Sequence, residues 1–208
     1  MRTSIAISIA GLLLLSACSG NIRPDYKEVV VEDQFRLDIP ETMQATNELH
    51  DFANLQVADE KEGFFLIGIA EPKEDLENLQ LFYSIEDYAD FVQRTVGGGL
   101  DTFNVATQHN QVINGFNCLS ADLFGAISTE DEASLEVYYR VIILESPRYF
   151  YQLIGWTSRD NFRNFRSVAN HIECSFVEME ASQPESPGAI DAADSPEAPG
   201  IAAEANPS

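Results

Sequence analysis

The feature that most constrains the fold is a series of strand-like runs joined by short turns. Residues 102–113 and 116–127 are two such runs, and Asn114-Gly115 lies between them. Asn-Gly is a strong signal for a two-residue hairpin, because both turn residues take positive φ. Residues 135–144 and 149–156 form the next pair of runs. Since both carry apolar residues on both faces, we expect central strands that are covered on both sides.

Two shorter pairs of β-rich runs precede these strands. Residues 26–31 and 34–39 form the first pair, and Pro40 closes it because proline cannot donate to a sheet ladder. Residues 53–58 and 64–70 form the second pair around an acidic turn that ends in glycine. Hairpins therefore dominate, and the sequence predicts an α+β fold with a mostly antiparallel sheet flanked by helices.

Helical spacing of apolar residues predicts a first helix that begins after Ser84. Ser84 is a suitable N-cap, with Asp87 in the first turn. Gly97-Gly98-Gly99 should end the helix, with glycine in a left-handed C-cap. The expected buried stripe is Ile85, Tyr88, Phe91 or Val92, and Val96.

A second helix is predicted near the end of the domain. It should begin at Thr157 or Ser158, with Thr157 and Asp160 as a capping box, and end near Cys174. Residues 175–177 follow as an extended segment. The expected buried stripe is Phe162, Phe165, Ala169 and Ile172.

The first 18 residues have the pattern of an exported bacterial lipoprotein. The apolar run from Ile5 to Leu15 is shorter than the about 20 residues of a membrane-spanning helix, so it is typical of a signal peptide. Leu15-Ser16-Ala17-Cys18 resembles the lipobox, in which cleavage precedes a cysteine whose sulfur carries a diacylglycerol. The resemblance implies a signal peptide over 1–17 and lipidation at Cys18, the alternative being an ordinary signal peptide with a coincidental cysteine. Ser19 in place of aspartate then favours the outer membrane.

A tether and a polar tail frame the folded part. The tether, residues 18–25, extends at most about 25 Å beyond the cysteine at roughly 3.5 Å per residue, so the domain over 26–178 should sit close to the membrane. Residues 179–208 are rich in Ala, Pro and Glu and contain no Lys, Arg or aromatic residue. Such a segment cannot offset its ordering entropy, so we predict disorder. It is either a solvated terminus or a spacer or bait for a cationic envelope partner.

Charge excludes one class of partner. The chain has 34 Asp+Glu against 12 Lys+Arg, a formal net charge of -22, whereas a nucleic-acid binder needs a basic face. We therefore expect no nucleic-acid partner.

Four stretches together are similar to the PsbP-like and DcrB-like envelope domains. Their order and spacing cover most of residues 26–178. The resemblance implies an α-β-α sandwich around an antiparallel sheet, a non-catalytic accessory or assembly role, and no catalytic residue or cofactor. The stretches are residues 35–40, 112–116, 149–157 and 172–176.

Cys118 and Cys174 are the only cysteines beyond Cys18. An exported chain meets an oxidising compartment, so a Cys118–Cys174 disulfide is allowed. The alternative is two separate buried thiols, which behave as small apolar groups.

The remaining candidate groups point to structural roles. The three histidines, His50, His109 and His171, share no metal-ligand spacing, so we predict no metal site.

Two further sets of residues, one aromatic and one acidic, each have two possible interpretations. The aromatic set is core packing or the floor of a sugar or lipid groove, and the acidic set is a solvated edge or a surface for a basic partner or a loosely held cation. The aromatic set is Tyr138, Tyr139, Tyr149, Phe150, Tyr151 and Trp156, and the acidic set is Asp59, Glu60, Glu62, Glu71, Glu74, Asp75 and Glu77.

These features favour a non-enzymatic, membrane-anchored envelope lipoprotein that acts as an accessory or assembly module through contacts with an envelope protein. The first alternative is a binder or carrier of a small apolar or sugar ligand in a groove between sheet and helix. The second is a hydrolase whose site is assembled from scattered acids.

Overall fold

The computed structural model describes residues 24–81, 83–128 and 133–179. The predicted signal peptide over 1–17, the lipidation at Cys18 and the tail beyond residue 179 lie outside the described residues. The regular elements run from Tyr26 to Glu178.

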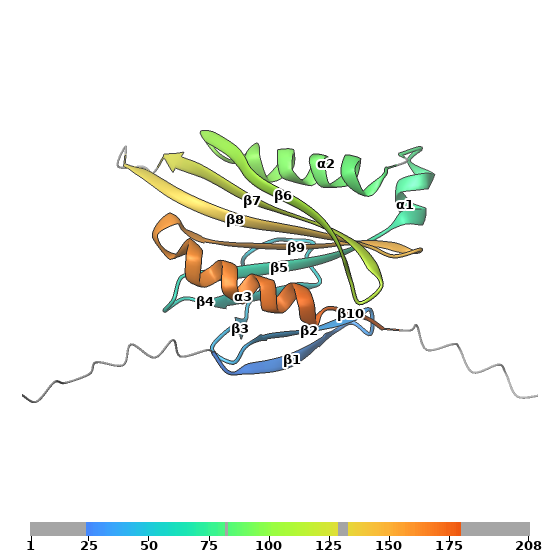
Figure 1. The fold of residues 1–208 in the computed structure, drawn as a ribbon, viewed down its shortest axis with the longest axis horizontal. Coiled ribbons are helices and arrows are strands. Elements are labelled where there is room, and N and C mark those ends of the chain that lie inside the picture. The colour runs from blue at the N-terminus through green and yellow to red at the C-terminus, as the bar shows by residue number, and fades with distance from the viewer. Residues whose placement is uncertain (1–23, 82, 129–132, 180–208) are drawn as a thin grey trace, which may run out of the picture.

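Two antiparallel sheets form the framework (Figure 1). The prediction of a single sheet is wrong, because the strand at 35–40 pairs with the first and last strands of the domain and forms a sheet with them. The large sheet has seven strands in the order β3 (Gln44–Ala45), β4 (Leu55–Asp59), β5 (Phe64–Pro72), β9 (Tyr149–Ser158), β8 (Ser134–Glu145), β7 (Phe116–Ser128) and β6 (Thr102–Ile113). The small sheet has the order β1 (Tyr26–Val31), β2 (Phe35–Pro40) and β10 (Val177–Glu178).

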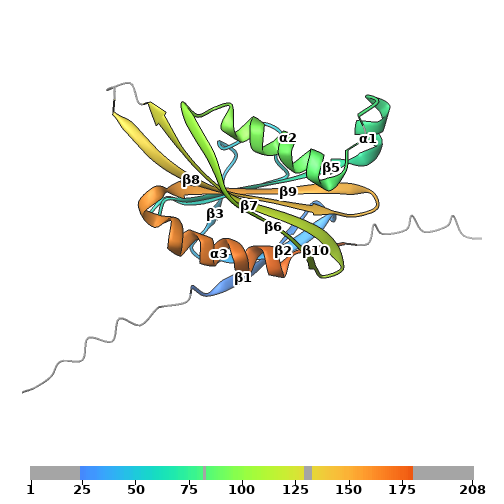
Figure 2. The same ribbon diagram turned by 45° about the horizontal axis from the view of Figure 1, so that its top comes forward.

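Helices cover both faces of the large sheet, which gives the expected α-β-α layers (Figure 2). The long helix α2 (Ile85–Gly97) lies on one face, and α3 (Phe162–Ser175) lies on the other. A short helix that the sequence did not predict, α1 (Lys73–Asn78), follows β5. The predicted α+β class is confirmed.

The turn at Asn114-Gly115 forms as predicted. Asn114 has φ of 49° and Gly115 has φ of 90°, and residues 102–113 pair with residues 116–126 across it. The central position of β8 and β9, with strands on both sides, is also confirmed.

The two ends of α2 differ in how well the sequence predicts them. Ser84 caps the first turn, and its hydroxyl accepts a hydrogen bond from the Asp87 amide at 3.1 Å. The predicted left-handed C-cap is wrong, because Gly98 has φ of -65°. Glycine is required here for space instead. A Cβ on Gly97 would lie 2.6 Å from the ring of Phe103.

The second helix starts later than predicted. β9 continues through Thr157 and Ser158, which pair with β8, and a 3₁₀ turn over Arg159–Asn161 precedes α3. The predicted Thr157–Asp160 capping box is therefore wrong, because strand pairing holds Thr157 in the sheet. The predicted stripe is confirmed, since Phe165, Ala169 and Ile172 are buried and Phe162 is partly buried.

The large sheet separates two cores. One core lies between the sheet, α3 and the small sheet, and Phe35, Tyr138 and Phe165 are fully buried in it. The other lies beneath α2, around Tyr88 and Val92. Each face of the sheet therefore has its own packing, and the α2 face carries the site described next.

Candidate functional site

Helix α2 covers only part of its face of the sheet. It packs mainly on β7 and β8, and the neighbouring surface of β5 and β9 is only partly covered. The opening is a groove of about 330 Å³ between the helix, the sheet and the loop of residues 46–54. Phe91 and Val96 line it from the helix, Ile69 and Trp156 from the sheet, and Leu49 from the loop.

A row of stacked aromatic rings crosses the sheet at one end of this groove. Phe65 on β5 lies directly opposite Trp156 on β9, which lies opposite Tyr139 on β8. The ring centroids are 5.5 Å apart for Phe65–Trp156 and 6.0 Å apart for Tyr139–Trp156, with interplanar angles of 15° and 28°. All three side chains are half-buried, and Tyr139 and Trp156 line the groove. The row offers a flat apolar surface with one exposed edge.

Gln152, a polar residue that lines the groove, is paired with a buried tyrosine of α2. The Gln152 amide donates to the Tyr88 hydroxyl at 2.7 Å, and the Tyr88 ring stacks on Phe150 at 4.3 Å. Burial, together with the charge of Glu71, raises the pKa of Tyr88 well above its ordinary value. Tyr88 is 1% exposed and does not line the groove, so an occupant meets a chiefly apolar lining whose polar members are His50, Thr95 and Gln152.

The residues that flank the groove lining in the sequence, here called its rim, are mostly acidic. The loop of residues 46–54 carries Glu48 and Asp51 and no lysine or arginine. On the helix, Asp90 directly precedes Phe91 and pairs with Arg94 at 3.0 Å. Helix α2 as a whole has three acidic residues and a single arginine.

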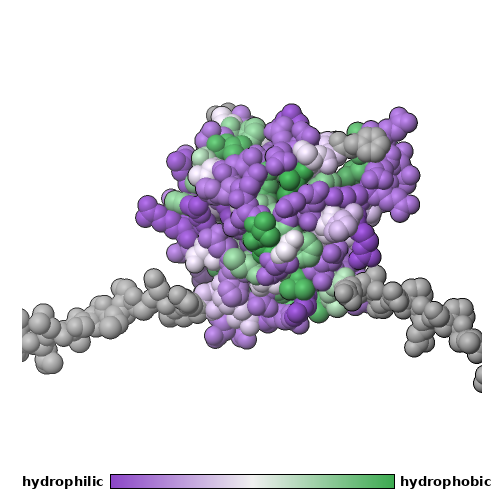
Figure 3. Space-filling view, turned by 45° about the vertical axis from the view of Figure 1, so that its right-hand side comes forward, coloured by the Kyte–Doolittle hydropathy of each residue, from purple (hydrophilic) through white to green (hydrophobic). Residues whose placement is uncertain are grey.

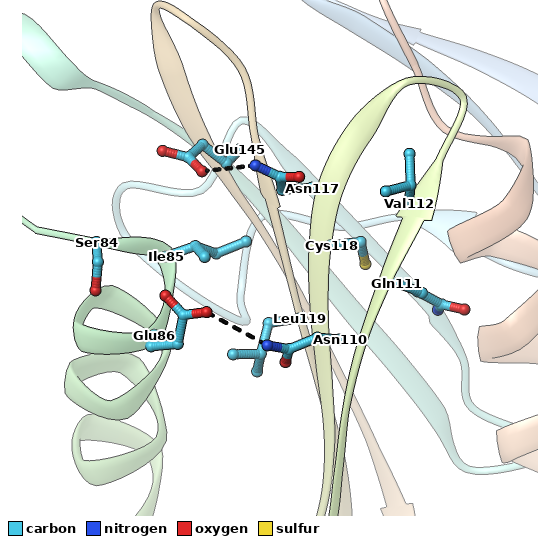
Figure 4. Close-up of a pocket in the computed structure, with 10 residues that line it drawn as sticks. All are labelled: Ser84, Ile85, Glu86, Asn110, Gln111, Val112, Asn117, Cys118, Leu119 and Glu145. Atoms are coloured by element: carbon cyan, nitrogen blue, oxygen red, sulfur yellow. Dashed lines mark hydrogen bonds between the residues drawn. The ribbon is translucent and has the colours of Figure 1, made fainter.

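A second cavity, of about 570 Å³, lies between the start of α2 and the β6–β7 hairpin (Figure 4). Its lining is polar, and its carboxylates are already engaged. Asn110 donates to Glu86 at 3.3 Å, Asn117 donates to Glu145 at 3.3 Å, and Lys73 pairs with Glu145 at 2.7 Å. These contacts tie the hairpin to α2 and to β8.

Cys118 lines this second cavity but is not an activated nucleophile. Its thiol is buried and donates to Glu173 at 3.3 Å. Burial, reinforced by the Glu173 carboxylate, raises the pKa of the Cys118 thiol far above its ordinary value. The thiolate that nucleophilic chemistry needs is therefore disfavoured.

The disulfide that the sequence allowed is not formed in this structure. Cys118 and Cys174 are free thiols, the first buried and the second exposed. Glu173 faces the sheet, and its neighbour Cys174 is turned about 100° further around the helix, because an α-helix has 3.6 residues per turn. Cys174 therefore points away from Cys118.

A buried charge network beneath α3 was not predicted. Arg140 on β8 pairs with Asp122 on β7 at 3.0 Å and with Glu173 on α3 at 2.9 Å, and all three side chains are at most 5% exposed. Tyr138 and Thr107 also donate to Asp122, at 2.6 and 2.7 Å.

Burial alone would raise the pKa of the Asp122 carboxyl. The two hydroxyl donors and the Arg140 and Arg166 guanidinium groups outweigh it and hold that pKa below its ordinary value. The signal in the sequence was one charged residue with apolar neighbours near the middle of each strand, Asp122 between Ala121 and Leu123 and Arg140 between Tyr139 and Val141.

The three histidines lie in separate places. His50 lines the groove, His109 is exposed on β6, and His171 lies 3.7 Å from Asp38 and stacks on Tyr26. Within residues 24–81, 83–128 and 133–179, no group of three His, Cys, Asp or Glu could hold a metal ion.

The acidic set divides between the two ends of β5. Asp59, Glu60 and Glu62 belong to the β4–β5 turn, where Asp59 accepts from the Glu62 amide at 3.1 Å. The other four lie at the far end of β5 and on α1. Figure 3 shows one face of the molecule, which is mostly hydrophilic with a narrow band of apolar residues.

The aromatic set also divides, between core and groove. Tyr138, Phe150 and Tyr151 are at most 2% exposed and belong to the cores. Tyr139 and Trp156 belong to the groove. The core interpretation therefore holds for Tyr138, Phe150 and Tyr151, and a sugar or lipid groove over Tyr139 and Trp156 stays a prediction.

Solved structures share this fold. The cyanobacterial PsbP protein (CyanoP) of Synechocystis sp. PCC 6803 has a TM-score of 0.53 and 14% identity, over 79% of this chain and 98% of that chain. The Ran-binding protein Mog1p of Saccharomyces cerevisiae has a TM-score of 0.51 and 10% identity, over 74% of this chain and 96% of that chain. LpqN of Mycobacterium tuberculosis, involved in cell envelope biogenesis, has a TM-score of 0.48 and 14% identity, over 75% of this chain and 91% of that chain.

At these identities the likeness shows the fold alone, a PsbP/Mog1-type α+β domain. Searches with protein-family models and against curated proteins give no match to the sequence. None of the helices among the described residues is long and apolar enough to cross a membrane.

Proposed function

We propose that this protein is a lipid-anchored accessory module of the bacterial cell envelope, attached to the outer membrane through Cys18, that acts by binding another protein. The observation that carries the binding role is the groove beside α2, with its half-buried aromatic row. An apolar surface of this kind gives affinity by burial and has no reacting group of its own. The fold serves protein binding in Mog1p, which is a Ran-binding protein.

The position of the groove suits a partner away from the anchoring membrane. β1 and β10, the first and last strands, both flank β2, so the tether would join the domain at the small sheet. In Figures 1 and 2, α2 lies at the opposite side of the molecule from the small sheet. A groove beside α2 would therefore face the aqueous compartment.

Charge defines the chemistry of the partner. An apolar side chain would enter the groove, and Glu48 and Asp51 on its rim would attract lysine or arginine beside it, whereas Asp90 is paired with Arg94. We therefore propose a partner segment that is apolar at its centre and basic at its flanks. Because rim charges are exposed, added salt should slow its association.

Photo-crosslinking in intact cells tests this proposal. A benzophenone amino acid in place of Phe91, which is 45% exposed, should capture one specific protein. The same residue in place of Leu79, which is 69% exposed at the end of α1, is the control. Loss of the Phe91 product in a Trp156→Ala background would support the groove. Equal products from both positions, or none from Phe91, would overturn it.

The anchor is tested separately by Cys18→Ser. The substituted protein should move from the membrane fraction to the aqueous fraction, because several acyl chains contribute about 0.8 kcal/mol per buried CH₂ and a hydroxyl carries none. Retention of the Cys18→Ser protein in the membrane fraction would refute the lipid anchor without affecting the groove.

A second function is favoured by the size of the groove. Its volume of about 330 Å³ falls at the lower end of the range of ligand pockets, about 300–1,000 Å³. The groove would then hold a small apolar or sugar ligand, with Trp156 and Tyr139 against its flat face. Native mass spectrometry of the purified chain would distinguish the two, because a carrier retains an added small mass and a Trp156→Ala variant loses it.

A further inference from the structure

Strand β6 is a long edge strand with an open side. It has 12 residues, ten of which are exposed, and it forms the outer edge of the large sheet (Figure 1). Among the described residues it pairs with β7 alone. An edge of this kind presents a row of backbone N–H and C=O groups on which another strand can pair.

Proteins usually protect such edges with charges, prolines or short strands. The other edges of this molecule follow that pattern. β3 and β10 have two residues each, and β1 carries Lys27 and Glu28. β6 has no Lys, Arg, Asp, Glu or Pro in its 12 residues. Its register is irregular between Val105 and Thr107, and the seven residues from Thr107 to Ile113 then pair continuously.

The absence of charge on β6 indicates which partner it suits. The chain has a formal net charge of -22, yet this strand is neutral. A cationic partner finds no opposite charge on β6 itself. A second copy of the chain, which is repelled elsewhere on the surface, meets the least repulsion here.

We propose that two copies of this protein associate through their β6 strands, which pair antiparallel over residues 107–113 around a two-fold axis. The two seven-stranded sheets then form one continuous sheet of two copies. The pairing is self-complementary, as a two-fold interface requires. It also covers Val112, which is 69% exposed in the single chain. The groove beside α2 is not part of this interface, so the proposal stands apart from the proposed function.

Added charge on β6 tests the pairing. The full chain in detergent is compared with a His109→Glu/Val112→Glu variant by native mass spectrometry over a range of protein concentrations. Like charges on paired strands are destabilising, and the two-fold axis doubles each one. We expect the dimer dissociation constant to rise by at least about tenfold, which is about 1.4 kcal/mol.

The matched control is Gln44→Glu/Leu79→Glu, which adds the same two negative charges elsewhere. Gln44 is exposed on β3, at the opposite edge of the sheet, and Leu79 is as exposed as Val112. It should leave the dissociation constant unchanged. A chain that stays monomeric at high concentration, or a dimer equally sensitive to both variants, would overturn the proposal.

Disulfide trapping gives a second test that does not depend on the charged variant folding. A two-fold axis perpendicular to the sheet puts one residue of β6 opposite its own copy, with Cα atoms about 4.5–5.5 Å apart, within the range of a disulfide. In a Cys174→Ser background, single cysteines at 108–112 should give a covalent dimer mainly at one position, the residue on the axis. Dimers at none of these positions, or at all of them equally, would refute the antiparallel pairing.

Discussion

Removal of the buried arginine should destabilise the fold strongly, and the structure sets the size of the effect. Arg140→Met keeps a long side chain but leaves two buried carboxylates without their shared cation. Asp122 retains Arg166 at 3.2 Å and two hydroxyl donors. Among the described residues, Glu173 retains Gln111 at 2.7 Å and the Cys118 thiol.

The substitution therefore leaves one buried carboxylate, that of Glu173, without a cation. Breaking a buried pair from one side costs about 3–5 kcal/mol, and we expect that loss in the free energy of unfolding at neutral pH. Adding Glu173→Gln removes the stranded charge. The double variant should be more stable than Arg140→Met alone, and the coupling energy from the double-mutant cycle should be about 0.5–3 kcal/mol, because the two residues are in contact.

Urea unfolding followed by the fluorescence of Trp156, the one tryptophan of the chain, measures both values. Arg94→Met is the matched control, since Arg94 also pairs with a carboxylate at 3.0 Å but is 68% exposed. Its loss should be about 0.3–0.5 kcal/mol. If Arg140→Met cost no more than the control, or if Glu173→Gln worsened it, the argument from stranded charge would be refuted.

Three further predictions follow from burial. Cys174 should react with a maleimide in the native protein and Cys118 only after unfolding, as mass spectrometry of the labelled peptides would show; equal labelling would contradict the structure. Gly155→Ala should cost about 1–3 kcal/mol in urea unfolding by overpacking, since its Cβ would lie 2.5 Å from the ring of Phe165. Asp122→Asn should destabilise the protein at neutral pH. Because the folded pKa of Asp122 is lowered, its contribution is complete above the ordinary value of 3.8 and is lost as pH falls through the folded value. The difference from the unsubstituted protein should therefore shrink below about pH 4, and a constant difference would contradict it.

Local chemistry decided the elements that the sequence predicts correctly. Asn114-Gly115 forms its hairpin because the backbone of these two residues accepts positive φ, whatever packs nearby. Ser84 caps α2 because its hydroxyl reaches an amide three residues away. These preferences act within a few residues, so a single sequence contains them.

Long-range pairing decided the elements that the sequence does not predict. Thr157 has the chemistry of a helix cap, but its place opposite Tyr138 keeps it in β9. Asp122 and Arg140 meet because the register of β7 and β8 puts them directly opposite each other. The groove, too, depends on which strands α2 covers, and helix spacing contains no information on that point.

The open groove follows from the widths of the parts. Strands lie about 4.8 Å apart and a helix is about 10 Å wide, so one helix covers about two strands of a sheet. On the α3 face, the small sheet packs beside the helix and closes what the helix leaves open. On the α2 face the described residues form no second sheet, and α2 packs mainly on β7 and β8. The loop of residues 46–54 covers the rest only in part, so Ile67 and Ile154 are buried while Phe65 and Trp156 stay half-buried. A substitution that fills the groove, such as Ile69→Trp, would change its volume but not the reason that it exists.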